Sequence, residues 1–200
     1  MALAYAGGLA LKMGTLPTVI VTARTPPLLG TNTSLCLSSI VKTPATALPA
    51  AAKTLSYLNS ALAFHEAQKK GYGEAVLLDV DGNLAECASS SLFFVQKGIL
   101  HTPSLSLGIL PGIVRARVIA LARGVGFRIK EGRFKPVALL RADEVFITNS
   151  SKEIVPVERF GKTKIGGGHP GPLTLHLGKL YREMVERYAS KAASRSERRV

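Results

Sequence analysis

The 200-residue sequence is 46% hydrophobic and carries a formal net charge of +13, a composition that favours a globular chain with a buried core over a disordered one. Six of the 26 lysines and arginines fall in residues 182–199, without interleaved aromatic residues, zinc-ligand spacing or a helix-turn-helix pattern, so the sequence predicts neither a specific nucleic-acid module nor a metal site. No apolar run approaches the ~20 residues of a membrane span, and two cysteines are too few for a disulfide scaffold, which favours a cytoplasmic location.

The N-terminal third of the sequence has an unusual composition. Residues 1–65 contain neither Asp nor Glu, which is also typical of organellar transit peptides. Residues 18–23, however, are rich in β-branched side chains and bounded by prolines, and residues 38–41 also favour a short strand. We therefore expect folded structure in this region, and an organellar transit peptide is the alternative.

A lysine opens the first predicted helix, which covers residues 53–70. Leu55, Leu58, Leu62 and Ala63 recur along one face of this helix, and a proline-containing segment that resists helix formation precedes it. Lys53 is therefore expected at a strand-to-helix junction, with its side chain among alanines and leucines. A poorly solvated amine has a lowered pKa, which suits it to attack a carbonyl carbon and form a Schiff base. The alternative is a solvated surface lysine.

The rest of the chain predicts a mixed α/β arrangement in which most strands are joined by hairpins, with a tight turn at Asp81-Gly82. Strands are expected at residues 74–78, 83–86, 92–95, 99–101, 127–130, 143–148 and 154–157, the last of them at the edge of a sheet. Helices are expected at residues 113–124, 136–141 and 173–188, and the first of these is expected to bury Ile113.

Three further segments carry polar groups at the ends of predicted elements. Glu86 ends a strand and is followed by small hydroxyl residues. Residues 110–112 lead through a glycine into a helix N-terminus, where free backbone N–H groups can hold a phosphate. Residues 148–151 form a hydroxyl-rich turn after a buried strand, which also suits a phosphate. Taken singly, these segments also fit an ordinary hairpin, helix start and β-turn.

In this order, the segments resemble the fold-type IV, or class IV, pyridoxal-phosphate-dependent aminotransferases. That family includes branched-chain and D-amino-acid aminotransferases and aminodeoxychorismate lyase. The resemblance covers roughly residues 17–188 and rests on the spacing of Lys53, Glu86 and Gly112 and on the phrase at residues 142–157. It implies an α/β fold whose C-terminal domain is a pseudobarrel of mixed sheets surrounded by short helices.

The resemblance also predicts how the chain is divided. Residues 53–188 are expected to form the cofactor-binding C-terminal domain, and residues 189–200 a basic tail. Residues 1–52 correspond to the tail end of a truncated N-terminal domain and a linker. In the family, the N-terminal domain supplies an arginine that clamps the cofactor phosphate.

The resemblance implies a role for each candidate site residue. Lys53 would form a Schiff base with pyridoxal phosphate and move the proton between carbon atoms. Glu86 would pair with the pyridine nitrogen, and Tyr57 would lie near the phenolic oxygen. The residues implied to hold the phosphate are Ile113, Val114, Asn149 and Ser150.

Two residues depart from the family pattern at the implied phosphate site. Val114 stands where the family usually carries a threonine, so a side-chain contact is lost while the backbone contact is kept. Lys152 adds a positive charge beside the hydroxyl-rich turn.

The resemblance predicts an aminotransferase, or its catalytic domain, that moves an amino group between an amino acid and a 2-oxo acid and forms a homodimer. One alternative is an enzyme of the aminodeoxychorismate lyase type, which the Glu86-Cys87-Ala88 phrase favours. The other is a truncated, non-catalytic paralogue that binds the cofactor weakly or not at all.

Overall fold

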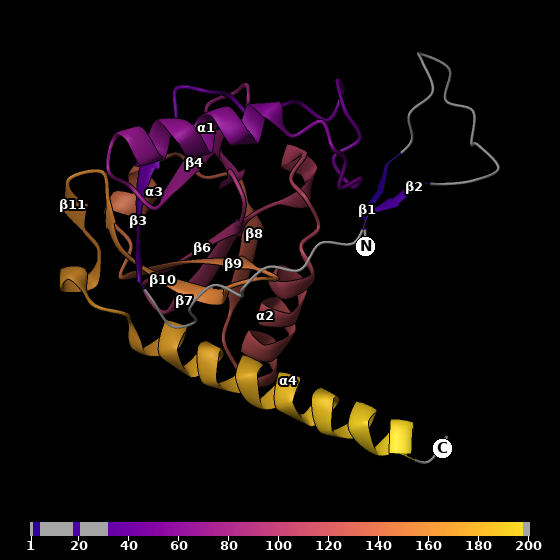
Figure 1. Cartoon of the computed structure of the whole chain (residues 1–200). Coiled ribbons are helices and arrows are strands. Elements are labelled where there is room, and N and C mark those ends of the chain that lie inside the picture. Colours follow the sequence, from indigo (N-terminus) through magenta and orange to yellow (C-terminus); the bar gives the residue numbers. More distant parts are fainter. Residues whose placement is uncertain (1, 5–17, 21–31, 198–200) are drawn as a thin grey trace.

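The computed structural model describes residues 2–4, 18–20 and 32–197, and a curled, mixed nine-stranded sheet forms its centre (Figure 1). The sheet strands are β3 (Thr33–Leu37), β4 (Glu74–Leu78), β5 (Leu84–Cys87), β6 (Ser91–Gln96), β7 (Ile99–Pro103), β8 (Ile129–Gly132), β9 (Glu144–Asn149), β10 (Glu153–Phe160) and β11 (Thr163–Lys164). The helices are α1 (Leu58–Lys69), α2 (Ile113–Gly124), α3 (Val137–Leu140) and α4 (Pro172–Glu197), with single 3₁₀ turns at Leu105–Leu107 and Gly166–Gly168. A separate antiparallel pair joins β1 (Ala2–Ala4) to β2 (Thr18–Ile20).

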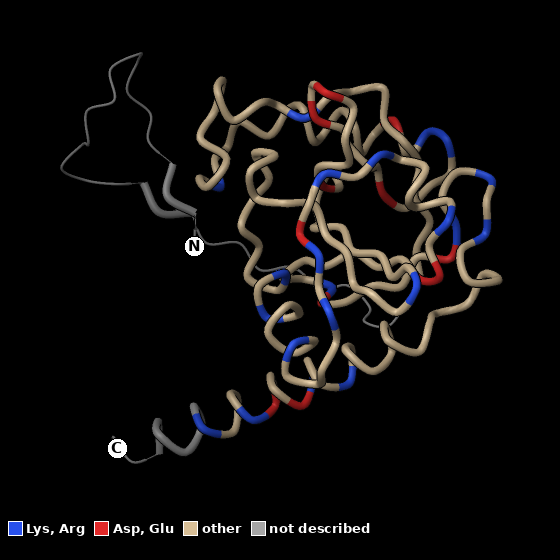
Figure 2. The backbone as a smooth tube through the Cα atoms, turned by 180° about the vertical axis from the view of Figure 1, so that it is seen from behind, with Lys and Arg blue, Asp and Glu red and all other residues tan. Residues whose placement is uncertain are grey.

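The sheet is mixed and nearly closes on itself. Its strand order is β5-β4-β3-β10-β9-β6-β7-β8, with β11 paired to β10. The pairs β3–β4, β3–β10 and β7–β8 are parallel, and the others are antiparallel. The Leu84 N–H at the start of β5 donates to the Phe134 carbonyl just after β8, at 2.7 Å. The two ends of the strand order therefore meet, and the backbone curls into a pseudobarrel (Figure 2). This confirms the predicted mixed α/β pseudobarrel.

Alternation along the strands separates an inner core from an outer one. On β6, Leu92 and Phe94 belong to the inner cluster, whereas Phe93 and Val95 pack outward against α2 and α4. This is the two-residue period of a strand that is buried on both faces. On the other side of the molecule, α1 covers β3 and β4 (Figure 1). The barrel is thus enclosed by helices on two sides.

α4 is held at its N-terminus by a buried carboxylate. Glu144 accepts the backbone N–H groups of Leu173 and Thr174 at 3.0 and 2.7 Å, so two helix-terminal donors are satisfied. Gly171 is needed at the approach, because a Cβ there would lie within 2.0 Å of the Glu144 side chain. From this anchor α4 runs to Glu197, through residues 189–197, and its second half extends away from the barrel (Figure 1). The predicted end of this helix near residue 188 was too early.

The prediction of β10 as an edge strand was wrong. β10 lies in the middle of the sheet, between β9 and β3. Its residues 153–156 pair with β9, and pairing with β3 begins only at Val157. Pro156, which lacks an N–H donor, therefore lies where β10 gains its second neighbour rather than at a sheet edge.

The segments around the first helix also differ from the prediction. The strand expected at residues 38–41 lies earlier, as β3. Residues 38–41 are irregular, although the Ser38 and Lys42 N–H groups still donate to carbonyls of β4. The strand expected at residues 18–23 is present as β2 over Thr18–Ile20, and residues 21–23 lie outside the described residues.

The apolar face predicted for the first helix is only partly the buried one. The helix begins at Leu58 rather than at residue 53, and Leu58 and Leu62 are 70% and 48% exposed. Ala63 is buried as predicted, and together with Ala67 it packs against β3 and β4. Small side chains let the helix approach the sheet closely, and only the tertiary contact selects that face.

Candidate active site

A cavity of about 670 Å³ gathers four segments that are far apart in the sequence. They are the loop before α1, the turn between β5 and β6, the start of α2, and the turn between β9 and β10. All of the predicted site residues line it, namely Lys53, Tyr57, Glu86, Ile113, Val114, Asn149 and Ser150. The structure therefore brings the candidate residues together, while their individual roles stay predictions.

Lys53 reaches the cavity from an irregular loop rather than from a helix. The loop precedes α1, and Lys53 is exposed within it, so the expected packing of this side chain among alanines and leucines is wrong. Its Nζ lies 5.8 Å from the centre of the Tyr57 ring, within the range of a cation–π contact. The amine is therefore open to an incoming carbonyl compound.

Tyr57 ties the Lys53 loop to the opposite wall. Its hydroxyl donates to the Ala88 carbonyl at 2.8 Å. Burial raises the pKa of Tyr57 above its ordinary value, and the nearby carboxylates of Glu74 and Glu86 add to the rise. The phenol is therefore protonated at neutral pH and acts as a donor.

Glu86 lies on β5, facing the cavity, and is held from two sides. Its Oε1 is 3.3 Å from Lys42 Nζ, and its Oε2 accepts the Leu110 N–H at 3.2 Å. Burial raises the pKa of this carboxyl, while Lys42, the Leu110 N–H and Lys53 act in the opposite direction. Sequence reasoning did not identify Lys42, because nothing in its neighbourhood distinguishes it until the fold places it beside Glu86.

A second carboxylate, Glu74, lies behind the hydroxyl-rich wall and also escaped the sequence prediction. It is 3% exposed and accepts hydrogen bonds from the Ser89 hydroxyl and, at 3.5 Å, from the Ser90 hydroxyl. Asn149 Nδ2 donates to Ser90 Oγ at 3.0 Å and so extends this network to the β9–β10 turn. Burial raises the pKa of Glu74 above its ordinary value. An acidic residue at the start of a strand of buried apolar residues was the available signal.

The β9–β10 turn is shaped by Asn149. Its Oδ1 accepts the backbone N–H groups of Ser151 and Lys152 at 3.0 and 2.7 Å. Glu153, the next residue, has a φ of 61°, in the left-handed region that a residue with a Cβ rarely adopts. This tight turn directs residues 148–152 along the cavity wall.

The first turn of α2 has unpaired backbone N–H groups at the cavity. Gly112 precedes the helix without capping it by a side chain, so the N–H groups of the first turn, including those of Ile113 and Val114, remain for a ligand or water. A Cβ on Gly112 would lie 2.9 Å from Ser91 Oγ, so the close approach of the chain requires glycine. The Ile113 side chain is 74% exposed, which corrects its predicted place in the core.

One buried hydroxyl at this end has no partner. Thr148 is 2% exposed and lines the cavity, and its Oγ1 makes no hydrogen bond within the described part of the chain. A buried polar atom without a partner is costly. Together with the free N–H groups of α2, it makes this end of the cavity suitable for a ligand rich in oxygen atoms.

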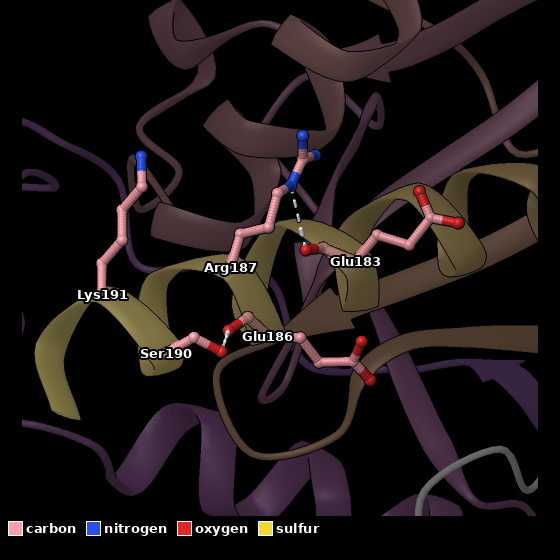
Figure 3. A pocket seen from close by; sticks show the side chains of 5 residues that line it. All are labelled: Glu183, Glu186, Arg187, Ser190 and Lys191. Carbon is pink, nitrogen blue, oxygen red and sulfur yellow. Dashed lines mark hydrogen bonds between the residues drawn. The ribbon is translucent and has the colours of Figure 1, made fainter. Parts of the chain in front are cut away.

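A second, shallow depression lies along α4 (Figure 3). Arg187 Nε donates to the Glu183 carbonyl at 3.2 Å, and Ser190 Oγ to the Glu186 carbonyl at 2.9 Å. These are contacts within one helix rather than a wall built from several elements, so the depression shows no sign of a built binding site. Within residues 2–4, 18–20 and 32–197, no helix is long and apolar enough to cross a membrane.

Several known proteins are similar to this chain in sequence. A branched-chain-amino-acid aminotransferase of Salmonella typhimurium is 39% identical over 131 residues, which cover 65% of this chain and 42% of the relative. A putative branched-chain-amino-acid aminotransferase of Methanocaldococcus jannaschii is 36% identical over 167 residues, which cover 83% of this chain and 58% of the relative. The chain thus spans about half the length of these relatives.

Solved structures agree with the sequence relatives. The branched-chain amino acid aminotransferase of Escherichia coli has a TM-score of 0.75 at 35% identity, covering 78% of this chain and 51% of that chain. The enzyme of Thermobaculum terrenum, in its PLP form, has a TM-score of 0.75 at 38% identity, covering 77% and 51%. The sequence profile of the amino-transferase class IV family matches residues 4–160. The chain therefore belongs to the class IV aminotransferase family.

Proposed function

We propose that this chain carries the cofactor site of a pyridoxal-phosphate-dependent aminotransferase. The observation that carries the proposal is the convergence of Lys53, Glu86 and the uncapped start of α2 on one cavity. The substrates would be an amino acid and a 2-oxo acid. Branched-chain amino acids are the first to test, because they appear in the names of the relatives.

The residues present fit the cofactor. The free N–H groups of α2 and the unpartnered Thr148 hydroxyl suit its phosphate, and the Glu86 carboxylate suits its pyridine nitrogen. Lys53 offers an exposed amine for its carbonyl group. The cavity, at about 670 Å³, lies within the range of about 300–1,000 Å³ that is usual for small-molecule sites.

Each residue has a definite chemical task under this proposal. When bound, pyridoxal phosphate supplies an electron-poor ring that stabilises negative charge at the α-carbon of the substrate. Lys53 would hold the cofactor through its carbonyl carbon, and its amine, when freed by the incoming substrate amine, would take and return the α-proton. Glu86 keeps a proton on the ring nitrogen, and Lys42 beside it favours the ionised carboxylate that this requires.

Covalent trapping tests the proposal. Pyridoxal phosphate is added to the purified chain, the carbon–nitrogen double bond is reduced with borohydride, and the modified peptide is identified by mass spectrometry. We expect the label on Lys53, none at that position in Lys53→Ala, and undiminished labelling in Lys69→Ala, which removes an exposed lysine of α1 outside the cavity lining. Equal labelling of Lys53→Ala, or no labelling of the parent, would favour the non-catalytic alternative.

Product analysis separates the two enzymatic alternatives. The relatives are named aminotransferases, which favours transamination over the lyase reaction. With a branched-chain amino acid and 2-oxoglutarate, we expect glutamate to form in step with the branched-chain 2-oxo acid. The predicted homodimer and cytoplasmic location remain part of this proposal, and sedimentation of the purified chain tests the former.

A further inference from the structure

The neutral donors at the α2 end of the cavity do not balance the charge of a phosphate group. A phosphate monoester carries a charge of about −1.5 to −2 at pH 7. The start of α2 contributes only about half a positive charge, and the hydroxyl groups of Thr148 and Ser150 contribute none. A side-chain cation would balance the remaining charge of the ligand.

Three of the four cations in the cavity lining have other partners. Lys42 lies 3.3 Å from Glu86, and Arg115 pairs with Glu131 at 2.7 Å and donates to the Pro103 carbonyl. Lys53 lies against the Tyr57 ring, and its amine is needed for the carbonyl carbon.

Lys152 is the fourth cation, and its side chain is uncommitted. It lines the cavity and is exposed, and its Nζ makes no ion pair or hydrogen bond with the residues that the structure describes. Its backbone, by contrast, is fixed, because its N–H donates to Asn149 Oδ1 at 2.7 Å in the tight β9–β10 turn. A fixed backbone with a free ammonium group is the arrangement expected of a residue that awaits an anionic ligand.

Two acidic groups could compete for the lysine. Glu153, the next residue, has its Oε2 3.6 Å from Arg182 Nε. Glu74 is buried, and its oxygens accept hydrogen bonds from Ser89, Ser90 and the Ala75 N–H. Lys152 opposes the rise in the pKa of Glu74, but the two side chains form no ion pair within 4.0 Å in the described part of the chain. The ammonium group is therefore available on the cavity side of the turn.

We propose that Lys152 binds the phosphate group of the cofactor and makes the cavity select phosphorylated over unphosphorylated pyridoxal. This inference rests on the proposed function. In it, Thr148, Ser150 and the α2 N–H groups orient the phosphate oxygens, and Lys152 supplies the charge. A lysine suits this position because it acts as a point charge on a flexible stem and tolerates an imprecise approach.

Equilibrium binding of two ligands tests the inference without any turnover. Pyridoxal phosphate and pyridoxal differ only in the phosphate, and their binding is followed by absorbance in the parent and in Lys152→Met. We expect Lys152→Met to weaken pyridoxal phosphate about 10- to 100-fold, as for loss of one charge-assisted hydrogen bond, and to leave pyridoxal unchanged. Competition by inorganic phosphate should weaken to a similar extent.

Two control variants define the outcome. Lys162→Met removes an exposed lysine outside the cavity lining and should leave both affinities unchanged, whereas Lys152→Arg should restore selectivity for the phosphorylated ligand. Equal weakening of both ligands in Lys152→Met, or no weakening of either, would overturn the role of Lys152 while leaving the proposed function intact. A parent chain that binds neither ligand would overturn both.

Discussion

Lys42 and Glu86 show how a site residue depends on a neighbour that the sequence does not reveal. Burial alone disfavours the ionised form of Glu86, and Lys42 at 3.3 Å opposes that effect. We expect Lys42→Met to raise the pKa of Glu86 further. Titration of the carboxyl carbons by NMR checks this, with Glu86→Gln identifying the resonance. An unchanged titration of that resonance would mean that Lys42 does not control the carboxylate.

Glu74 gives a residue-scale prediction about pH. Its pKa in the folded chain is raised by burial above the ordinary value of 4.5, so the folded state binds the proton more tightly than the unfolded state. Its contribution to stability is therefore full below about pH 4.5 and is lost as the pH rises through the folded pKa. We expect Glu74→Gln to flatten this part of the stability profile.

Urea unfolding across a series of pH values measures that slope. The neutral amide can still accept the Ala75 N–H, so the variant should fold. The pKa of Glu86 is raised as well, so Glu86→Gln should also flatten the profile, whereas Glu183→Gln on the exposed part of α4 is the matched control. A slope that is the same in Glu74→Gln and in the parent would contradict the prediction.

At the scale of elements, Glu66 joins α1 to the segment that carries Lys42. Its carboxylate accepts the Ser39 N–H and the Ser38 hydroxyl at 3.0 and 2.7 Å and pairs with Lys70. The pKa of Glu66 is lowered to about 2, first by Lys70 and then by Ser38. The folded state thus binds this proton more weakly than the unfolded state, and the contribution is lost as the pH falls from about 4.5 to about 2.

We expect Glu66→Gln to lower the stability of the folded chain at neutral pH. In this variant the loss of the Glu66 contribution between about pH 4.5 and about pH 2 should be absent. Thermal unfolding should show a larger difference between parent and variant at pH 7 than at pH 3, because only part of the contribution remains at pH 3. Glu183→Gln, on the exposed part of α4, is the control and should behave like the parent. A larger difference at pH 3 than at pH 7 would mean that the folded state binds the Glu66 proton more tightly than the unfolded state, which contradicts the prediction.

At the scale of the whole molecule, Phe134 closes the barrel. Its ring packs edge-on against Phe94 at 5.1 Å and against His101 at 5.4 Å, and its carbonyl accepts the Leu84 N–H across the gap between the two sheet ends. Phe134→Ala should keep the backbone bond but remove the ring. We expect a loss of about 2–4 kcal/mol in the free energy of unfolding, since the ring is only partly buried.

Urea unfolding measures the change, and Phe134→Leu should recover much of the loss because it refills the volume. Residues of β5 and of β8 should lose hydrogen-exchange protection together in Phe134→Ala, because both ends of the strand order meet at this ring. Loss of protection in only one of the two strands would indicate that the ring stabilises a single edge instead of the closure.

Local patterns predicted well where each element carries its own signal. The hairpin turn at Asp81-Gly82 and the strand that begins at Glu74 follow from turn chemistry and apolar runs, and Gly82 adopts a φ of 73° as such a turn requires. The family resemblance, which rests on several segments in order, predicted that Lys53 and Glu86 share a site, and the cavity lining includes both. Leu55, Leu58 and Leu62 misled, because a helical period identifies an apolar face without saying what covers it.

The sequence by itself determined the mixed α/β class, the family and the residues that gather at the cavity, since these depend on motifs read along the chain. Only the tertiary structure decided that Lys42 pairs with Glu86, that Glu74 is buried behind the serines, and that β10 lies inside the sheet. The physical reason is that burial, ion pairing and strand neighbours are relations between distant residues, and local periodicity does not encode them.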